Sequence, residues 1–167
     1  MWAAPLTMAD SIINNWSDCP EIETGLKPYY IPRYDKIVMP CVDTFFTRAN
    51  YIKTLFHEAA HATGAAKRLN RPGVVEEIIF GSTQYGFEEL IAEQAAAMLC
   101  QHCGINTEEN GLFDNSVQYI SSWINAINAD KYAVIKAASA ATKAVNMILG
   151  KTDTYQNQEN EAEAVNP

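Results

Sequence analysis

The sequence has few histidines, a deficit of basic residues and no long apolar run. It contains 12 lysines and arginines against 20 aspartates and glutamates, for a formal net charge of −8. Proteins that bind phosphate backbones concentrate Lys and Arg, so we expect no nucleic-acid binding by this chain alone. No apolar stretch has the length of a membrane span, and residues 1–16 lack the basic segment of a signal peptide. We therefore expect a cytoplasmic protein with no membrane partner.

Cysteine is also sparse. The four cysteines are too few and too scattered for a dense disulfide framework. Cys100 and Cys103 form a CxxC pair, which we interpret as two small apolar side chains on a helix face rather than a redox or zinc site. The length predicts one domain, residues 1–150. Residues 151–167 have no apolar periodicity and are expected to form a disordered polar tail.

Two of the three histidines lie in an HExxH motif formed by His57, Glu58 and His61. Apolar residues around the motif recur at three- and four-residue steps, which predicts a helix. Residues four apart share a helix face, so both imidazoles can bind one metal ion, for which we expect zinc. Glu58 is rotated by about 100° around the axis. It is therefore placed to act as the general base on the attacking water rather than as a ligand.

A catalytic zinc usually has a third protein ligand. The position that would complete a three-histidine site holds Lys67, and His102 is about 20 Å from Glu89 along a continuous helix. A helix predicted over residues 86–103 instead places Glu89 and Glu93 on one stripe with small residues. We assign Glu89 as the third ligand and Glu93 as an acceptor that orients a ligating histidine. The reverse assignment also fits the sequence.

Polar residues near the motif give further expectations. Glu88 is rotated by about 100° from the acidic stripe and is expected to face solvent. The basic residues Lys67, Arg68 and Arg71 lie in a long connection that can border the site. We interpret them as solvated, with contact to a carboxylate of the substrate as the alternative. Tyr85 is a candidate for hydrogen bonding an oxyanion, with a packed aromatic ring as the alternative.

The remaining pattern predicts an α+β fold, with a small antiparallel or mixed sheet packed on the HExxH helix and a mostly helical C-terminal half. Two strands are predicted at residues 29–31 and 36–39, and their bounding prolines favour sheet edges. An edge strand beside the motif helix can receive an extended peptide, and an ordinary covering sheet is the alternative. Gly64 is expected to end the motif helix in the left-handed conformation.

Two helices are expected in the C-terminal half, one capped within residues 114–116 and one starting after Asp130. They form an antiparallel pair that supplies core, and Val134 and Ile135 are expected to face inward.

Several segments between residues 28 and 150, taken in order, resemble the zincin-like metallopeptidase domain of ArdC-type antirestriction proteins from mobile elements. The matching segments are Tyr29-Tyr30-Ile31-Pro32, Asp35-Lys36-Ile37-Val38-Met39-Pro40, His57-Glu58-Ala59-Ala60-His61-Ala62-Thr63-Gly64, Arg68-Leu69-Asn70-Arg71, Glu88-Glu89-Leu90-Ile91-Ala92-Glu93 and Tyr119-Ile120-Ser121-Ser122-Trp123. The resemblance implies a zincin fold, a metal at His57 and His61 with a helix-borne glutamate, and Glu58 as catalytic residue.

Motif and resemblance together predict a zinc metallopeptidase of the gluzincin kind, acting on a peptide or protein substrate in antirestriction. One alternative is a metal-stabilised module that blocks a host enzyme by contact without proteolysis, and another is a purely structural metal. The presence of Glu58 favours hydrolysis, because a site that only held a metal would not need it. The single-stranded DNA binding of the family's N-terminal region is not carried over to this chain.

Overall fold

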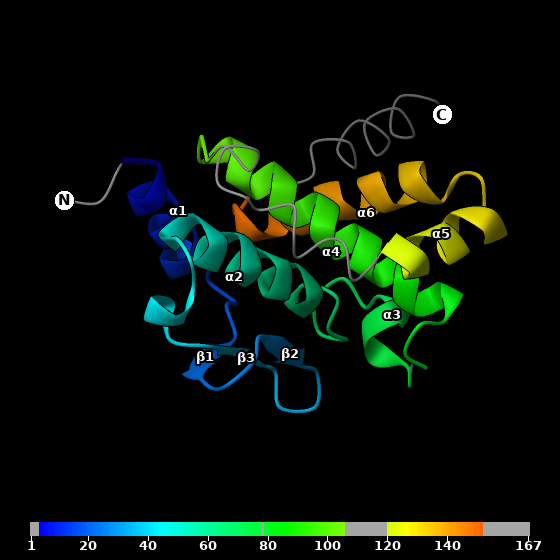
Figure 1. Cartoon of the computed structure of the whole chain (residues 1–167), viewed down its shortest axis with the longest axis horizontal. Helices are drawn as coiled ribbons and strands as arrows, with labels where there is room; N and C mark the ends of the chain where they lie inside the picture. Colours follow the sequence, from blue (N-terminus) through cyan, green and yellow to red (C-terminus); the bar gives the residue numbers. More distant parts are fainter. Residues whose placement is uncertain (1–3, 78, 106–119, 152–167) are drawn as a thin grey trace, which may run out of the picture.

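Two long helices, α2 (Arg48–Ala62) and α4 (Thr83–His102), run side by side through the middle of the molecule (Figure 1). The structure is a computed structural model and describes residues 4–77, 79–105 and 120–151. The remaining elements are α1 (Ala4–Asn15), β1 (Glu21–Thr24), β2 (Tyr29–Ile31), β3 (Lys36–Met39), the 3-10 turn η1 (Val42–Thr44), α3 (Pro72–Val75), α5 (Ile120–Ala129) and α6 (Ala133–Ile148).

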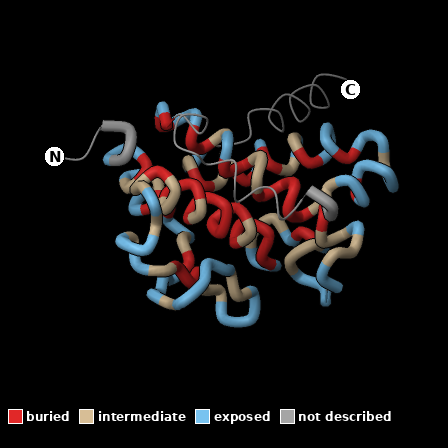
Figure 2. Tube along the Cα trace, viewed as in Figure 1, coloured by how far each residue is buried: buried red, intermediate tan, exposed pale blue. Residues whose placement is uncertain are grey.

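Helix α2 carries the HExxH motif and is buried along most of its length. Thr47 caps its first turn by accepting a hydrogen bond from the backbone N–H of Asn50 at 3.1 Å. Ile52, Phe56 and Ala59 are fully buried, and the buried residues form a continuous band along α2 and α4 (Figure 2). The motif therefore lies on a helix that the core holds on several sides.

Gly64 follows α2 but does not have the predicted left-handed conformation, which the structure gives to Gly81, Gly104 and Gly150. Its role is close packing. A Cβ at this position would lie 2.5 Å from Val74 Cγ2 and 2.8 Å from Arg71 Nη2, both of which are van der Waals overlaps. The glycine lets the following connection fold back against the end of α2.

The sheet lies on one side of α2 and has the order β1-β3-β2 (Figure 1). Strand β1 runs parallel to β3, and β2 runs antiparallel to it with Tyr30 opposite Ile37. The predicted edge position is wrong for β3, which is central. Pro40 follows the last paired residue, Met39, so it removes no ladder hydrogen bond. Strand β2 is at an edge, and Ile37 and Met39 join the core beneath α2.

Helices α5 and α6 pack on α4, as the α+β prediction requires, and the predicted fold class is confirmed. The inward face of α6 differs from the prediction: Val134 and Ile135 are 46% and 69% exposed. The buried positions are mainly alanines, whose small side chains allow close helix packing; they are Ala133, Ala137, Ala141, Ala144 and Ile148.

The cap predicted within residues 114–116 lies outside the described residues, as do residues 152–167 of the predicted tail. Cys100 and Cys103 are free and buried in the core, and burial raises the pKa of the Cys100 thiol to about 12. Among the described residues, no helix combines the length and apolar character that a bilayer crossing needs.

The connection after α2 is anchored to the sheet side by Arg68, contrary to the prediction of a solvated side chain. The Arg68 side chain is 2% exposed, and its guanidinium donates hydrogen bonds to both carboxylate oxygens of Asp35, at 2.7 and 3.0 Å. Lys67, by contrast, is largely exposed, with ion pairs to Asp18 and Asp35. The prediction was wrong for Arg68 because its partner lies 33 residues earlier in the chain.

We expect Asp35 to contribute stability that depends on pH. Burial raises the pKa of its carboxyl, but hydrogen bonds from Arg68, Lys67 and Tyr30 outweigh burial and lower it. Because the folded-state pKa is depressed, the contribution is full above about pH 4 and is lost as the pH falls through the folded-state value. Asp35→Asn keeps a residue that tolerates the positive φ of 50° at this position.

Urea unfolding of the wild type and Asp35→Asn measures this contribution. The variant is expected to have a free energy of unfolding lower by about 2 kcal/mol at pH 7. The difference is expected to shrink below pH 4. An equal difference at pH 7 and pH 3 would contradict the assignment of the stabilising charge to Asp35.

Candidate metal centre

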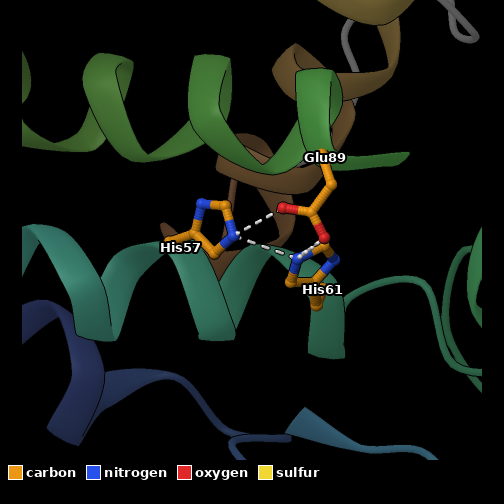
Figure 3. Close-up of side chains that lie close together, drawn as sticks. All are labelled: His57, His61 and Glu89. Atoms are coloured by element: carbon orange, nitrogen blue, oxygen red, sulfur yellow. Dashed lines mark hydrogen bonds and ion pairs between the residues drawn. The ribbon is translucent and has the colours of Figure 1, made fainter. Parts of the chain in front are cut away.

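Three side chains from α2 and α4 converge on one point (Figure 3). His57 and His61 lie one turn apart on α2, and their Nε2 atoms are 3.1 Å from each other. Glu89 reaches down from α4, with Oε2 3.3 Å from His57 Nε2 and Oε1 3.5 Å from His61 Nε2. Three ligand atoms at about 2.1 Å from one tetrahedral ion are separated by about 3.4 Å. The observed spacings match that geometry.

The outer nitrogen of each imidazole also faces a carboxylate. His57 Nδ1 lies 3.4 Å from Glu93 Oε2, and His61 Nδ1 lies 3.2 Å from Glu88 Oε1. A proton on each Nδ1 satisfies these contacts and leaves the Nε2 lone pairs directed at each other and at Glu89. Glu89 Oε2 is buried without a hydrogen bond among the described residues. Such a convergence of lone pairs is unfavourable unless a cation lies between them, so the residues fit a metal ion.

The electrostatics of the site also favour positive charge at this point. Burial lowers the pKa of His57, but its contacts with the carboxylates of Glu89 and Glu93 outweigh burial and raise the pKa to about 10 when no metal is bound, so that a proton on His57 then supplies the positive charge that a metal ion would otherwise supply. Burial raises the pKa of Glu89, yet its contacts with His57, His61 and Tyr85 lower it below its usual value. Glu89 is therefore ionised at neutral pH although it is only 6% exposed.

The centre opens into a cleft of about 320 Å³. Its lining includes both histidines and Glu89 together with Glu58 and Tyr85, and its opposite wall comes from the β2 region. Tyr85 contacts the ring of Phe80 with a centroid distance of 4.8 Å and also lowers the pKa of Glu89. Tyr85 thus borders the cleft as well as packing against an aromatic ring.

The structure corrects two expectations here. Glu88 is only 4% exposed rather than solvent-facing, and Arg71 is 8% exposed rather than solvated. The Arg71 guanidinium donates two hydrogen bonds to the Glu88 carboxylate, from Nε to Oε2 at 3.0 Å and from Nη2 to Oε1 at 2.7 Å. Helical periodicity did not predict the burial of Glu88 or of Arg71, because the two residues bury each other and Arg71 comes from the connection between the helices. One sequence feature did indicate that Arg71 is important: it lies in Arg68-Leu69-Asn70-Arg71, one of the segments that resemble the family.

Of the other residues considered in the sequence analysis, Glu93 lies next to the centre and His102 lies far from it. Glu93 lies behind His57 and forms an ion pair with Lys53, Nζ to Oε1 at 2.6 Å. It thus contacts the outer nitrogen of His57, while Glu89 faces the inner nitrogens of both histidines. His102 is exposed at the far end of α4, away from the centre.

The sequence and the fold match a known family. The family model described as zincin-like metallopeptidase matches residues 8–140, and this chain belongs to that family. Among solved structures, the Mn(II)-bound antirestriction protein ArdC from plasmid R388 is similar, with 35% identity and a TM-score of 0.70 over 90% of this chain and 54% of that one. The metal-free ArdC structure is also similar, with 33% identity and a TM-score of 0.65 over 98% of this chain and 52% of that one.

Two relatives are considerably longer. The uncharacterized protein y4eC of Sinorhizobium fredii is 32% identical over 135 residues, which are 81% of this chain and 42% of that protein. A DNA primase TraC of Escherichia coli is 30% identical over 141 residues, or 84% of this chain and 13% of the primase. The chain thus spans less than half the length of these relatives.

We expect a divalent metal to stabilise the folded protein through His57, His61 and Glu89. Zn²⁺ or Mn²⁺ at 100 times its dissociation constant is expected to add about 2.7 kcal/mol to the free energy of unfolding. Differential scanning calorimetry should show this as a rise in melting temperature of about 5–10 °C. The metal-dependent rise is expected to vanish in Glu89→Ala and to persist in Glu77→Ala, a control at an exposed position. Equal rises in both variants would contradict the assignment.

Proposed function

We propose that this protein is a metal-dependent peptidase that binds one divalent ion, zinc in the first instance, through His57, His61 and Glu89. The observation that carries the proposal is the convergence of these three groups, which line an open cleft together with Glu58. The membership of the zincin-like metallopeptidase family supports it. The related ArdC structure is Mn(II)-bound, which supports a divalent ion in this protein and makes Mn²⁺ the second ion to test.

When bound, the metal supplies a Lewis acid that polarises the scissile carbonyl and acidifies the attacking water. Glu58 lines the cleft beside both histidines, is 7% exposed, and serves as the general base. Its carboxylate accepts the proton of the attacking water and then donates it to the departing amine. Tyr85 borders the same cleft, and we propose that its hydroxyl stabilises the oxyanion that develops on the carbonyl.

The position of β2 supports an extended peptide as the substrate. β2 is an edge strand of the sheet, and Pro28, Tyr29, Tyr30 and Pro32 all line the cleft. An extended chain can add to this edge through backbone hydrogen bonds and so bring a peptide bond over the centre. The flanking prolines limit this pairing to a short stretch, since proline has no N–H to donate.

We further propose that the biological setting is antirestriction, because the similar solved structures are antirestriction proteins. The alternative is that the metal-bound domain blocks a host enzyme by contact alone. The formal net charge of −8 for the whole sequence supports that alternative, since acidic proteins can imitate nucleic acid.

Glu58→Gln separates these functions. The variant keeps the shape of the side chain and all proposed ligands, so metal binding and fold are expected to stay unchanged. Cleavage of an unfolded protein such as casein, followed by mass spectrometry of the products, is expected to fall by about 100- to 10,000-fold. Glu77→Gln is the matched control and is expected to cleave normally. If the wild type cleaves nothing when saturated with Zn²⁺ or Mn²⁺, the peptidase proposal is wrong.

The same two variants are then tested for protection of DNA from restriction in cells. Loss of protection together with loss of cleavage would support hydrolysis as the basis of antirestriction. Protection by Glu58→Gln at the wild-type level would reject that role and favour blocking by contact.

A further inference from the structure

Each proposed histidine ligand is backed by a carboxylate and then by a base. One series of contacts is His57–Glu93–Lys53, and the other is His61–Glu88–Arg71. On α2, Lys53, His57 and His61 follow at four-residue steps and therefore share one face. This face meets the acidic residues of α4. Each imidazole has a carboxylate at its Nδ1, and each of those carboxylates has a buried base behind it. Fixing the outer nitrogen of a ligating histidine sets its tautomer and ring orientation.

We propose that Arg71 is a positioning residue for the metal centre, acting through Glu88 to fix His61. This inference rests on the metal site proposed above and extends it to a residue outside the motif and outside both long helices. The Arg71 fork holds Glu88 through two hydrogen bonds, and Glu88 Oε1 faces His61 Nδ1 at 3.2 Å. A guanidinium suits this role because its planar fork fixes the orientation of a carboxylate, whereas an ammonium group fixes only its position.

Arg71 is itself rigidly held. It donates to Thr63 Oγ1 and to the carbonyl oxygen of Ala60, both at 2.8 Å, so it is tied to the last turn of α2. The same guanidinium therefore binds the end of the histidine helix and the glutamate of the opposite helix. Its contacts join α2 and α4 at the level of His61.

Two glycines provide the space for this arrangement. A Cβ on Gly64 would lie 2.8 Å from Arg71 Nη2, and a Cβ on Gly73 would lie 2.6 Å from Glu88 Cβ and 2.9 Å from its Oε2. The backbone of the connection between α2 and α4 therefore packs directly against the Arg71–Glu88 pair. Gly64 completes the HExxHxxG extension of the motif, and the structure explains it by this close approach rather than by a left-handed turn.

The charge balance agrees with the same inference. Four carboxylates surround the centre, Glu58, Glu88, Glu89 and Glu93, and Lys53 and Arg71 are the two buried bases paired among them. Two negative charges are left over when both histidines are neutral, and one divalent cation neutralises them. Loss of Arg71 would remove both hydrogen bonds that fix the orientation of the buried Glu88 carboxylate, and with them the fixed contact between Glu88 and His61.

The test compares zinc dissociation constants, measured by competition with a chromophoric chelator, for folded wild type, Arg71→Met and Arg68→Met. Arg68 is the matched control, because it lies in the same connection and is buried on Asp35 but contacts no metal-facing histidine. Arg71→Met is expected to bind zinc about 10- to 100-fold more weakly. Arg68→Met is expected to lose stability but to keep the wild-type affinity.

A second variant separates positioning from folding. Arg71→Met combined with Glu88→Gln removes the buried Glu88 charge that Arg71→Met leaves without a base. The double variant is therefore expected to be at least as stable as Arg71→Met. Its zinc affinity is still expected to be below the wild type, because nothing orients the amide against His61. The Co²⁺ complexes give an independent reading, since the d–d absorption of the double variant should differ from that of the wild type if the ligand geometry has changed.

The outcomes are distinct. If the wild type binds zinc and the double variant binds it equally tightly with the same Co²⁺ spectrum, the positioning role of Arg71 is wrong and the metal site stands. If the wild type itself binds neither Zn²⁺ nor Co²⁺, the proposed function fails. If Arg71→Met does not fold, the double variant decides in the same way.

Discussion

The structure depends on how α2 and α4 bury a set of charged side chains against each other. Ionised groups are costly to remove from water, and a helix interface tolerates them only when each has a partner of opposite charge or a hydrogen bond. Here Glu88 and Glu93 come from α4, and their paired bases, Arg71 and Lys53, come from the connection after α2 and from α2 itself. The interface is therefore specific, because a shift of one helix along the other would separate every pair.

The same interface has a second, apolar half. Towards the start of α2 and the end of α4 the contacts are made by core residues, among them Ile52, Leu99 and Cys100. Towards the end of α2 and the start of α4 they are made by histidines and glutamates (Figure 3). The apolar half fixes the distance between the helices, and the polar half uses that distance to bring three ligand atoms together. The cleft lies at the polar end, beside β2.

The sequence predicted what depends on periodicity within one element. The spacing of His57 and His61 places both rings on one face, and the stripe on α4 placed Glu89 and Glu93 towards them; the structure has this arrangement. Contacts that join distant elements were not predictable in this way. Arg71 and Glu88 were expected in solvent because each looks exposed within its own segment, and only the folded connection brings them together.

Two errors in the fold have the same origin. Strand β1 was not predicted, because it is exposed along its whole length and has Ile22 as its one apolar residue; its pairing with β3 defines it. On α6 we expected the large apolar residues Val134 and Ile135 to face inward. The stripe of alanines faces α4 instead, because small side chains allow the two helices to approach more closely. In both cases the neighbouring element decides, and a single sequence does not show which neighbour an element will have.

We infer that two imidazoles and one carboxylate from facing helices hold a single divalent ion. The most direct measurement is a crystal structure of the zinc-loaded protein with anomalous data collected on both sides of the zinc absorption edge. We expect one strong anomalous peak within about 2.2 Å of His57 Nε2, His61 Nε2 and a carboxylate oxygen of Glu89. A fully loaded crystal with no peak between these three side chains, or with its zinc at another site, would contradict it.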